Sequence, residues 1–228
     1  MPGSSAVNAL ETGVIELEPE EVVAKKNASE AYLGRQPIVD RGGRLIGYEL
    51  LYRGTDRSAS NASATFDVVV NLLNGVGFHE SLGRFRGNIN VCAEFLLSDT
   101  VELLSPERIV LEILETVRAT PQLVARIEYL KRRGFSFALD DFTSETAENA
   151  PFLEMVDYIK VDILAVPEET LAALVRGLRR YRAKLLAEKV EDAAAFERCL
   201  ELGFELFQGY HFARPQILTG KRPDPQRI

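Results

Sequence analysis

Hydrophobic and polar positions follow two alternating periods along most of the chain. Short apolar runs typical of buried strands are followed by longer runs with apolar residues at every third or fourth position. The short runs predict strands at residues 44–53, 86–91, 108–115, 135–142, 156–163, 183–190 and 204–212. The longer runs predict helices at residues 66–77, 93–104, 121–134, 168–182 and 193–203. Repeated strand–helix units are typical of parallel strands with helical crossovers.

The number of these units predicts the fold class. We expect an α/β protein with a TIM-like (β/α) barrel as its single domain, because a closed barrel leaves no open sheet edge. An open, doubly wound sheet has the same periodicity and is the alternative. The expected organisation is a mobile N-terminal tail at 1–28, the barrel domain at 29–217 and a C-terminal tail or linker at 218–228, where Pro223 and Pro225 lie.

Composition narrows the class of partner and the compartment. The chain has 228 residues, of which 46% are hydrophobic, which is enough for a sizeable core. Its formal net charge of -7 argues against binding to duplex nucleic acid, which needs clustered basic residues. Cys92 and Cys199 show no metal-type spacing and are typical of a reducing compartment. Without an apolar run long enough to cross a bilayer, the chain is expected to be cytoplasmic and not to bind a membrane.

Polar side chains recur at the C-terminal end of one predicted strand after another. They are Glu49, Asn90, Glu112, Glu115, Asp140, Asp141, Lys160, Asp162, Glu188, Glu191 and Gln208. In a parallel barrel these strand ends share one mouth, where active sites are found. A single strand-end acid is more often solvated or caps a helix. The repetition favours a shared site, to which Glu115, Asp162 and Glu191 are the weakest candidates.

The side-chain types at these positions indicate a site for hard cations. Several carboxylates in one mouth repel each other unless positive charge is bound between them. Oxygen ligands without histidine or cysteine select Mg²⁺, Mn²⁺ or Ca²⁺ over Zn²⁺. Two such ions about 4 Å apart are able to activate a water and stabilise the leaving oxygen of a phosphodiester. Lys160 would hold the water or neutralise phosphate charge.

The motifs that carry these residues resemble those of the EAL domain family. The resemblance runs roughly from Tyr32 to Pro215, through RQPIVDRGGRLIGYELLYR, NINV, LEILE, LDDF, IKVD, AEKVE and LFQGYHFARP. It implies a TIM-like barrel that cleaves cyclic di-GMP to linear pGpG in bacterial signalling, with two Mg²⁺ or Mn²⁺ ions.

The resemblance also implies roles for individual residues. The implied metal ligands are Glu49, Asn90, Glu112, Asp140, Asp141 and Glu188. The implied catalytic residues are Lys160, Glu188 and Gln208, with Gln208 near the hydrolytic water. The implied contacts to the dinucleotide are Gln36, Glu49, Arg53 and Asp141. Glu115 would be the glutamate that steadies a nearby loop.

Departures from the family pattern are concentrated around the same motifs. Leu50 stands in place of the motif alanine, Leu114 in place of a threonine and Lys189 in place of a glycine. After the aspartate pair the family usually reads FGTGYSSL, a loop that supports metal binding and dimer contact, whereas here the chain reads FTSETAENAPFL, with Thr143 in place of the glycine. We therefore expect a monomer or a weak dimer. The opening segment and the tail look most like the EAL half of EAL–HDOD proteins, so an HDOD domain or another protein is an expected partner.

Three hypotheses for function follow. The complete set of acids favours a metal-dependent phosphodiesterase that acts on cyclic di-GMP. The altered loop after Asp141 favours the alternative, a catalytically weak or inactive module that binds cyclic di-GMP or a protein partner. An unrelated metal-dependent barrel of the enolase or aldolase type fits the order of the motifs poorly.

Overall fold

The computed structural model describes residues 30–52, 65, 68–69, 77 and 81–221. The predicted tail at 1–28, most of the predicted helix at 66–77, and Arg53 lie outside these residues.

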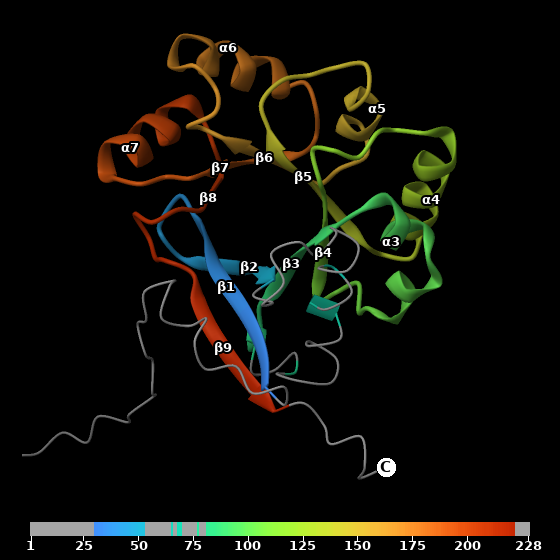
Figure 1. Ribbon diagram of the computed structural model, residues 1–228. Helices are drawn as coiled ribbons and strands as arrows, with labels where there is room; N and C mark the ends of the chain where they lie inside the picture. Colours follow the sequence, from blue (N-terminus) through green and yellow to red (C-terminus); the bar gives the residue numbers. More distant parts are fainter. Residues whose placement is uncertain (1–29, 53–64, 66–67, 70–76, 78–80, 222–228) are drawn as a thin grey trace, which may run out of the picture.

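Eight strands close into a barrel, which confirms the predicted fold over the open-sheet alternative (Figure 1). The strands are β1 (Glu30–Asp40), β2 (Leu45–Tyr52), β3 (Arg86–Val91), β4 (Ile109–Ile113), β5 (Ser136–Phe142), β6 (Tyr158–Asp162), β7 (Lys184–Glu188) and β8 (Leu206–Phe207). Neighbouring strands from β2 to β8 are parallel. β1 is antiparallel to both β2 and β8 and closes the ring.

The helices lie outside this ring (Figure 1). They are α3 (Ala93–Leu97), the 3-10 helix η3 (Asp99–Leu103), α4 (Pro121–Arg132), α5 (Ala150–Leu153), α6 (Glu168–Leu178) and α7 (Ala193–Leu202). Side-chain caps begin two of them, because Thr120 accepts from Leu123 N and Asp192 accepts from Ala195 N. The segment predicted as one helix at 93–104 is divided at Ser98, whose backbone is extended.

The hydrophobic core fills the space between the barrel and the helices. All five residues of β4 are buried, and α4 turns Leu123, Ile127 and Leu130 inward. Burying a side chain of this size stabilises a fold by about 1.5–3 kcal/mol relative to leaving it exposed. The strands are therefore held as a packed scaffold for the groups at their ends.

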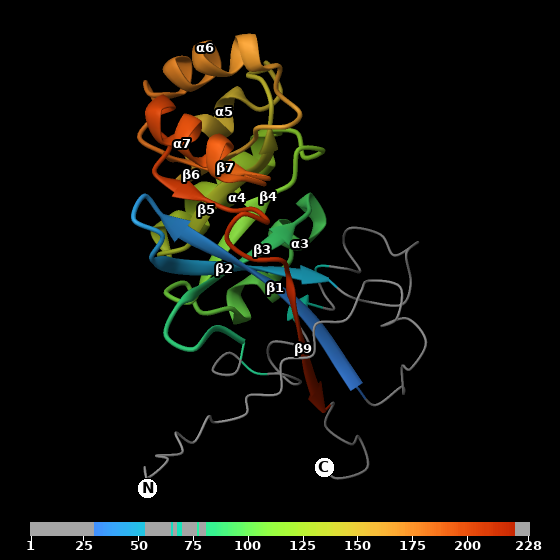
Figure 2. The ribbon, with the colours of Figure 1, turned by 90° about the vertical axis from the view of Figure 1, so that its left-hand side faces the viewer.

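Two strands at the ends of the described chain were not predicted. β1 was not among the predicted strands, because Gly34 and Pro37 interrupt its apolar pattern. Residues 218–221, predicted as part of a tail, belong to β9 (Gln216–Lys221), which pairs with β1 along Glu30–Arg35 (Figure 2). β8 pairs with β1 only at Val39 and Asp40, so the first half of that edge of β1 is free to pair with β9.

The predicted last strand is also too long, because only Leu206 and Phe207 of residues 204–212 form a strand. No helix in the described part of the chain is long and apolar enough to cross a membrane.

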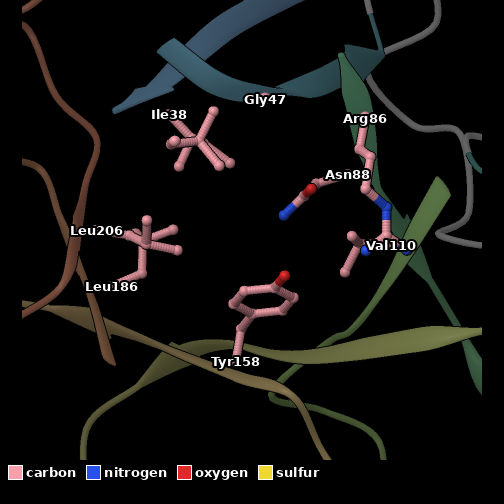
Figure 3. Close-up of a pocket in the computed structure, with 9 residues that line it drawn as sticks. Ile38, Gly47, Arg86, Asn88, Val110, Tyr158, Leu186 and Leu206 are labelled. Carbon is pink, nitrogen blue, oxygen red and sulfur yellow. The ribbon is translucent and has the colours of Figure 1, made fainter. Parts of the chain in front are cut away.

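A small pocket lies at the end of the barrel where the parallel strands begin (Figure 3). Arg86, Tyr158 and Leu206, which line it, are the first residues of β3, β6 and β8. The predicted site residues lie at the opposite ends of these strands.

Candidate active site

A buried lysine lies at the centre of the carboxylates. Lys160 Nζ lies 2.6 Å from Asp140 Oδ1, 3.0 Å from Glu112 Oε2, 3.0 Å from Glu188 Oε1 and 3.6 Å from Glu49 Oε2. These five residues come from five strands, β2, β4, β5, β6 and β7, and all are buried. The structure thus brings together four of the predicted strand-end acids around one positive charge, at the mouth expected for an active site.

Burial and charge together perturb the protonation of this cluster. Burial alone would lower the pKa of Lys160, but the charges of Asp140, Glu112, Glu188 and Glu49 outweigh it and hold that pKa well above its ordinary value. Burial raises the pKa of Glu112 well above its ordinary value, and Lys160 only partly offsets this. Burial likewise raises the pKa of Glu188 to about 8. With a pKa of about 8, Glu188 keeps its proton at neutral pH when no metal ion is bound.

Two asparagines of β3 contact the same cluster. The side-chain amide of Asn90 lies 3.1 Å from both Glu112 Oε2 and Asp140 Oδ2, and it donates to both when its nitrogen is on that side. With its oxygen on that side, it would face only carboxyl oxygens, and a carboxyl proton or a cation would have to lie between them. Asn88 Nδ2 donates to Glu112 Oε1 at 2.8 Å. The sequence analysis missed Asn88, although two asparagines separated by one residue in a strand point to the same face.

Gln208 joins the last strand of the barrel to the first two. Its Nε2 donates to Gln36 Oε1 at 3.0 Å and to Glu49 Oε2. The backbone holds it in place, since Val190 N donates to Gln208 O at 3.0 Å. The next residue must be glycine: Gly209 has φ 156°, and a Cβ atom there would lie 2.1 Å from Val190 O.

A bulge in β5 brings the second aspartate to the mouth. The pairing of β5 with β6 shifts register between Leu139 and Phe142, and Asp141 has φ 43°. Asp141 Oδ1 accepts from Lys189 Nζ at 3.1 Å, and the same ammonium donates to Asp162 Oδ2. Two adjacent aspartates, which in a regular strand would point to opposite faces, therefore both reach this mouth.

The remaining candidates lie at the surface or outside the described residues. Glu115 and Glu191 are exposed, in agreement with their rank as the weakest candidates. Asp162 is buried and contacts Lys189 rather than the Lys160 cluster. Arg53 lies outside the described residues.

The donor chemistry of the mouth fits a hard divalent cation. In the described part of the chain, Glu188 Oε2 and Gln208 Oε1 are buried without a hydrogen-bond partner. Such atoms are costly unless a water or an ion satisfies them. Among the described residues, no three acidic, histidine or cysteine side chains have the spacing of a metal site, and four carboxylates contact the Lys160 ammonium. The mouth therefore contains the oxygen donors that such a cation needs, and in this structure the Lys160 ammonium lies among them.

Comparison with known proteins decides the family. The family model of the EAL domain matches residues 90–215. The chain belongs to the EAL domain family. The matched segment contains Asn90, Glu112, Asp140, Lys160 and Glu188, which lie together at the mouth.

Two curated relatives are similar to most of this chain. The EAL chain is 32% identical over 197 residues to "Uncharacterized protein YuxH" of Bacillus subtilis, covering 83% of this chain and 48% of the relative. It is 33% identical over 204 residues to "Cyclic di-GMP phosphodiesterase CdgJ" of Vibrio cholerae, covering 86% of this chain and 47% of the relative. The chain thus spans about half the length of these curated relatives.

A solved structure agrees with the fold. The Bacillus subtilis YkuI protein, which has an EAL domain and was solved with cyclic di-GMP and calcium, matches with a TM-score of 0.64 at 20% identity. The match covers 88% of this chain and 58% of that one. At this identity the likeness supports the barrel fold alone.

Proposed function

We propose that this EAL domain is a metal-dependent phosphodiesterase that hydrolyses cyclic di-GMP to linear pGpG. One observation carries the proposal: four carboxylates, Glu49, Glu112, Asp140 and Glu188, surround one buried lysine at the active-site end of the barrel. A relative that is 33% identical is named a cyclic di-GMP phosphodiesterase. Burying this many acids together is costly for stability, which favours a chemical role for them.

The proposed cofactor is Mg²⁺ or Mn²⁺, as two ions. Their proposed ligands are Glu49, Asn90, Glu112, Asp140, Asp141 and Glu188, all of which contribute oxygen atoms. When bound, such ions lower the pKa of a water and stabilise charge on the phosphate oxygens. The unpartnered Glu188 Oε2 supports this assignment.

The proposed catalytic roles follow from charge and hydrogen bonding. The raised pKa of Lys160 keeps it protonated at neutral pH, so it acts through its positive charge and not as a base. Gln208 Nε2 is already engaged with Gln36 and Glu49, while its Oε1 has no hydrogen-bond partner within the described residues. We infer that Gln208 Oε1 accepts a hydrogen bond from the attacking water. The proposed contacts to the dinucleotide are Gln36, Glu49, Arg53 and Asp141.

Hydrolysis by the purified chain tests the proposal. Cyclic di-GMP is incubated with Mg²⁺ or Mn²⁺, and pGpG is measured by chromatography. We expect pGpG from the wild type and none above background from Asp140→Asn, which removes the carboxylate nearest to Lys160. The matched control is Asp99→Asn, an exposed aspartate of η3, which should retain the wild-type rate.

The other outcomes separate the alternatives. Cyclic di-GMP binding in Ca²⁺ without product in Mg²⁺ or Mn²⁺ would make the chain a binding module. If the chain shows neither binding nor product, its function would instead involve a protein partner, such as an HDOD domain.

The proposed oligomeric state is a monomer or a weak dimer. The loop after β5 is held by its own hydrogen bonds, from Thr146 N to Asn149 Oδ1 at 2.9 Å and from Asn149 Nδ2 to Ser144 O at 2.9 Å. Light scattering after gel filtration measures the state. A tight dimer that is lost when residues 143–152 are substituted would contradict the proposal.

A further inference from the structure

Two non-glycine residues with left-handed backbone contact each other at the mouth. Among the described residues, Asp141 with φ 43° and Lys189 with φ 59° are the non-glycine residues of positive φ. Such a conformation costs an L-residue roughly 1–2 kcal/mol. It persists where the surrounding structure holds it, and often at a functional site. Lys189 stands where the family usually has glycine, the residue that adopts this conformation without cost.

Lys189 connects Asp141 to a fixed point in the barrel. Asp162 is buried, and its Oδ1 accepts from Leu164 N at 2.9 Å and from Ala165 N at 3.1 Å. The other oxygen, Asp162 Oδ2, accepts from Lys189 Nζ, which also donates to Asp141 Oδ1 at 3.1 Å. The ammonium is thus anchored on one side by an aspartate that cannot move freely.

Asp141 needs such an anchor more than the other acids do. Its side chain is 44% exposed, whereas that of Asp140 is 8% exposed and contacts Lys160. Residues 143–149 form hydrogen bonds and ion pairs with one another, with α5, and with Arg118, Ala119 and Arg180. Lys189 approaches Asp141 from β7, on the other side of β6.

We propose that Lys189 is a positioning residue that holds Asp141 as a metal ligand. The ammonium binds Oδ1 and leaves Oδ2 of Asp141 available to a divalent cation. Lys189 thereby supplies, from the end of β7, the support that the altered loop after β5 does not give. The inference rests on the proposed function and adds a residue to that site. A group that orients a ligating carboxylate in this way contributes about 10–100-fold to metal affinity.

Calorimetric titration of the purified, metal-free chain with Mn²⁺ tests this role without any measurement of catalysis. We expect Lys189→Met, which keeps the length of the side chain and removes its charge, to weaken the affinity for the more weakly bound ion by about 10–100-fold. Lys189→Arg should keep the Mn²⁺ affinity near the wild-type value, because a guanidinium is also able to donate to two carboxylates. Lys189→Gly relaxes the backbone at φ 59° and should weaken binding as Lys189→Met does.

The matched control is Lys131→Met. Lys131 lies on α4, outside the barrel, and its Nζ also forms an ion pair, 3.0 Å from Asp157 Oδ1. Its removal should leave Mn²⁺ binding unchanged.

The results distinguish this inference from the proposed function. Unchanged affinity in Lys189→Met and Lys189→Gly would overturn the positioning role while leaving the metal site intact. Tighter binding in either variant would also overturn it, because the ammonium would then compete with the ion for Asp141. Absence of binding of both Mn²⁺ and Mg²⁺ by the wild type would overturn both proposals together.

Discussion

Asp140 and Asp141 are adjacent in the sequence but are neutralised by different lysines. Asp140 Oδ1 lies 2.6 Å from Lys160 Nζ, in the buried cluster, and Asp141 Oδ1 lies 3.1 Å from Lys189 Nζ at the rim. The bulge at the end of β5 separates them, because Asp141 has a left-handed backbone. A substitution at Asp140 therefore removes a charge from the buried cluster, whereas a substitution at Asp141 removes a charge at the rim.

Substitutions at Asp141 should separate the cost of its backbone from the loss of its charge. Asparagine tolerates the left-handed region better than alanine does. We therefore expect Asp141→Ala to be less stable than Asp141→Asn by roughly 1 kcal/mol, although both lose the ion pair with Lys189. Urea unfolding of the metal-free chains measures the difference. Equal stability of the two variants would mean that residue 141 is free to leave its positive φ.

Removal of Lys160 should destabilise the metal-free chain strongly. Lys160→Met leaves Asp140, Glu112, Glu188 and Glu49 buried without their shared positive charge. Removing one partner of a buried ion pair typically costs about 3–5 kcal/mol. Urea unfolding should show this loss, and added Mn²⁺ should recover more stability in Lys160→Met than in the wild type.

The control for this change is Lys131→Met, which breaks a partly exposed ion pair with Asp157. It should cost only about 1 kcal/mol or less through its charge. A comparable loss of stability in both variants would indicate that Lys160 is not the main source of positive charge that stabilises the buried carboxylates.

Strand periodicity was a reliable guide to the barrel. Each parallel strand from β2 to β7 lies within a predicted run, because its apolar side chains are buried under helices. β1 and β9 were missed for a physical reason. In β1, Gly34 and Pro37 interrupt the apolar pattern. The pairing of β9 with β1 is non-local, joining Lys221 to Glu30 across almost the whole described chain, and local sequence does not encode it.

The site was predictable in its members but not in its contacts. Residue type and strand-end position were enough to predict Glu49, Glu112, Asp140, Lys160 and Glu188, which the structure brings together. The pairing of Lys189 with Asp141 was not predicted, because it depends on two backbone conformations that a lysine and an aspartate rarely adopt.

Substitution of Gly209 should damage the site without changing a catalytic side chain. In Gly209→Ala the new Cβ would lie 2.1 Å from Val190 O, so the chain after β8 must shift. Gln208 would then lose its position beside Gln36 and Glu49, and we expect hydrolysis to fall by at least about 10²-fold, since a misplacement of about 1 Å is enough for such a loss. Gly83→Ala is the matched control, because Gly83 has a positive φ but nothing within 4 Å of the new Cβ. Hydrolysis at the wild-type rate by Gly209→Ala would show that the position of Gln208 is unimportant.

The raised pKa values of Glu188 and Glu112 predict how metal affinity and stability change with pH. In the metal-free chain, burial raises the pKa of Glu188 to about 8, so this carboxyl group is largely protonated at neutral pH. A carboxyl group must lose its proton to bind a metal ion, so Mg²⁺ binding near pH 7 should release about one proton or more, and binding near pH 9 should release fewer. Calorimetry in two buffers of different ionisation enthalpy measures this number. Affinity should accordingly increase as the pH rises to about 8.

The stability of the metal-free chain should change in the opposite direction. Because the folded-state pKa of Glu188 is above the ordinary value of 4.5, the folded chain binds more protons than the unfolded chain between these pH values. This group therefore favours folding most at low pH, and its contribution is lost as the pH rises through about 8. Thermal unfolding should show a decrease in Tm from about pH 6 to about pH 9 without metal, and a smaller decrease with saturating Mg²⁺. Mg²⁺ binding without proton release near pH 7 would mean that Glu188 is already ionised and that Lys160 compensates the cluster fully.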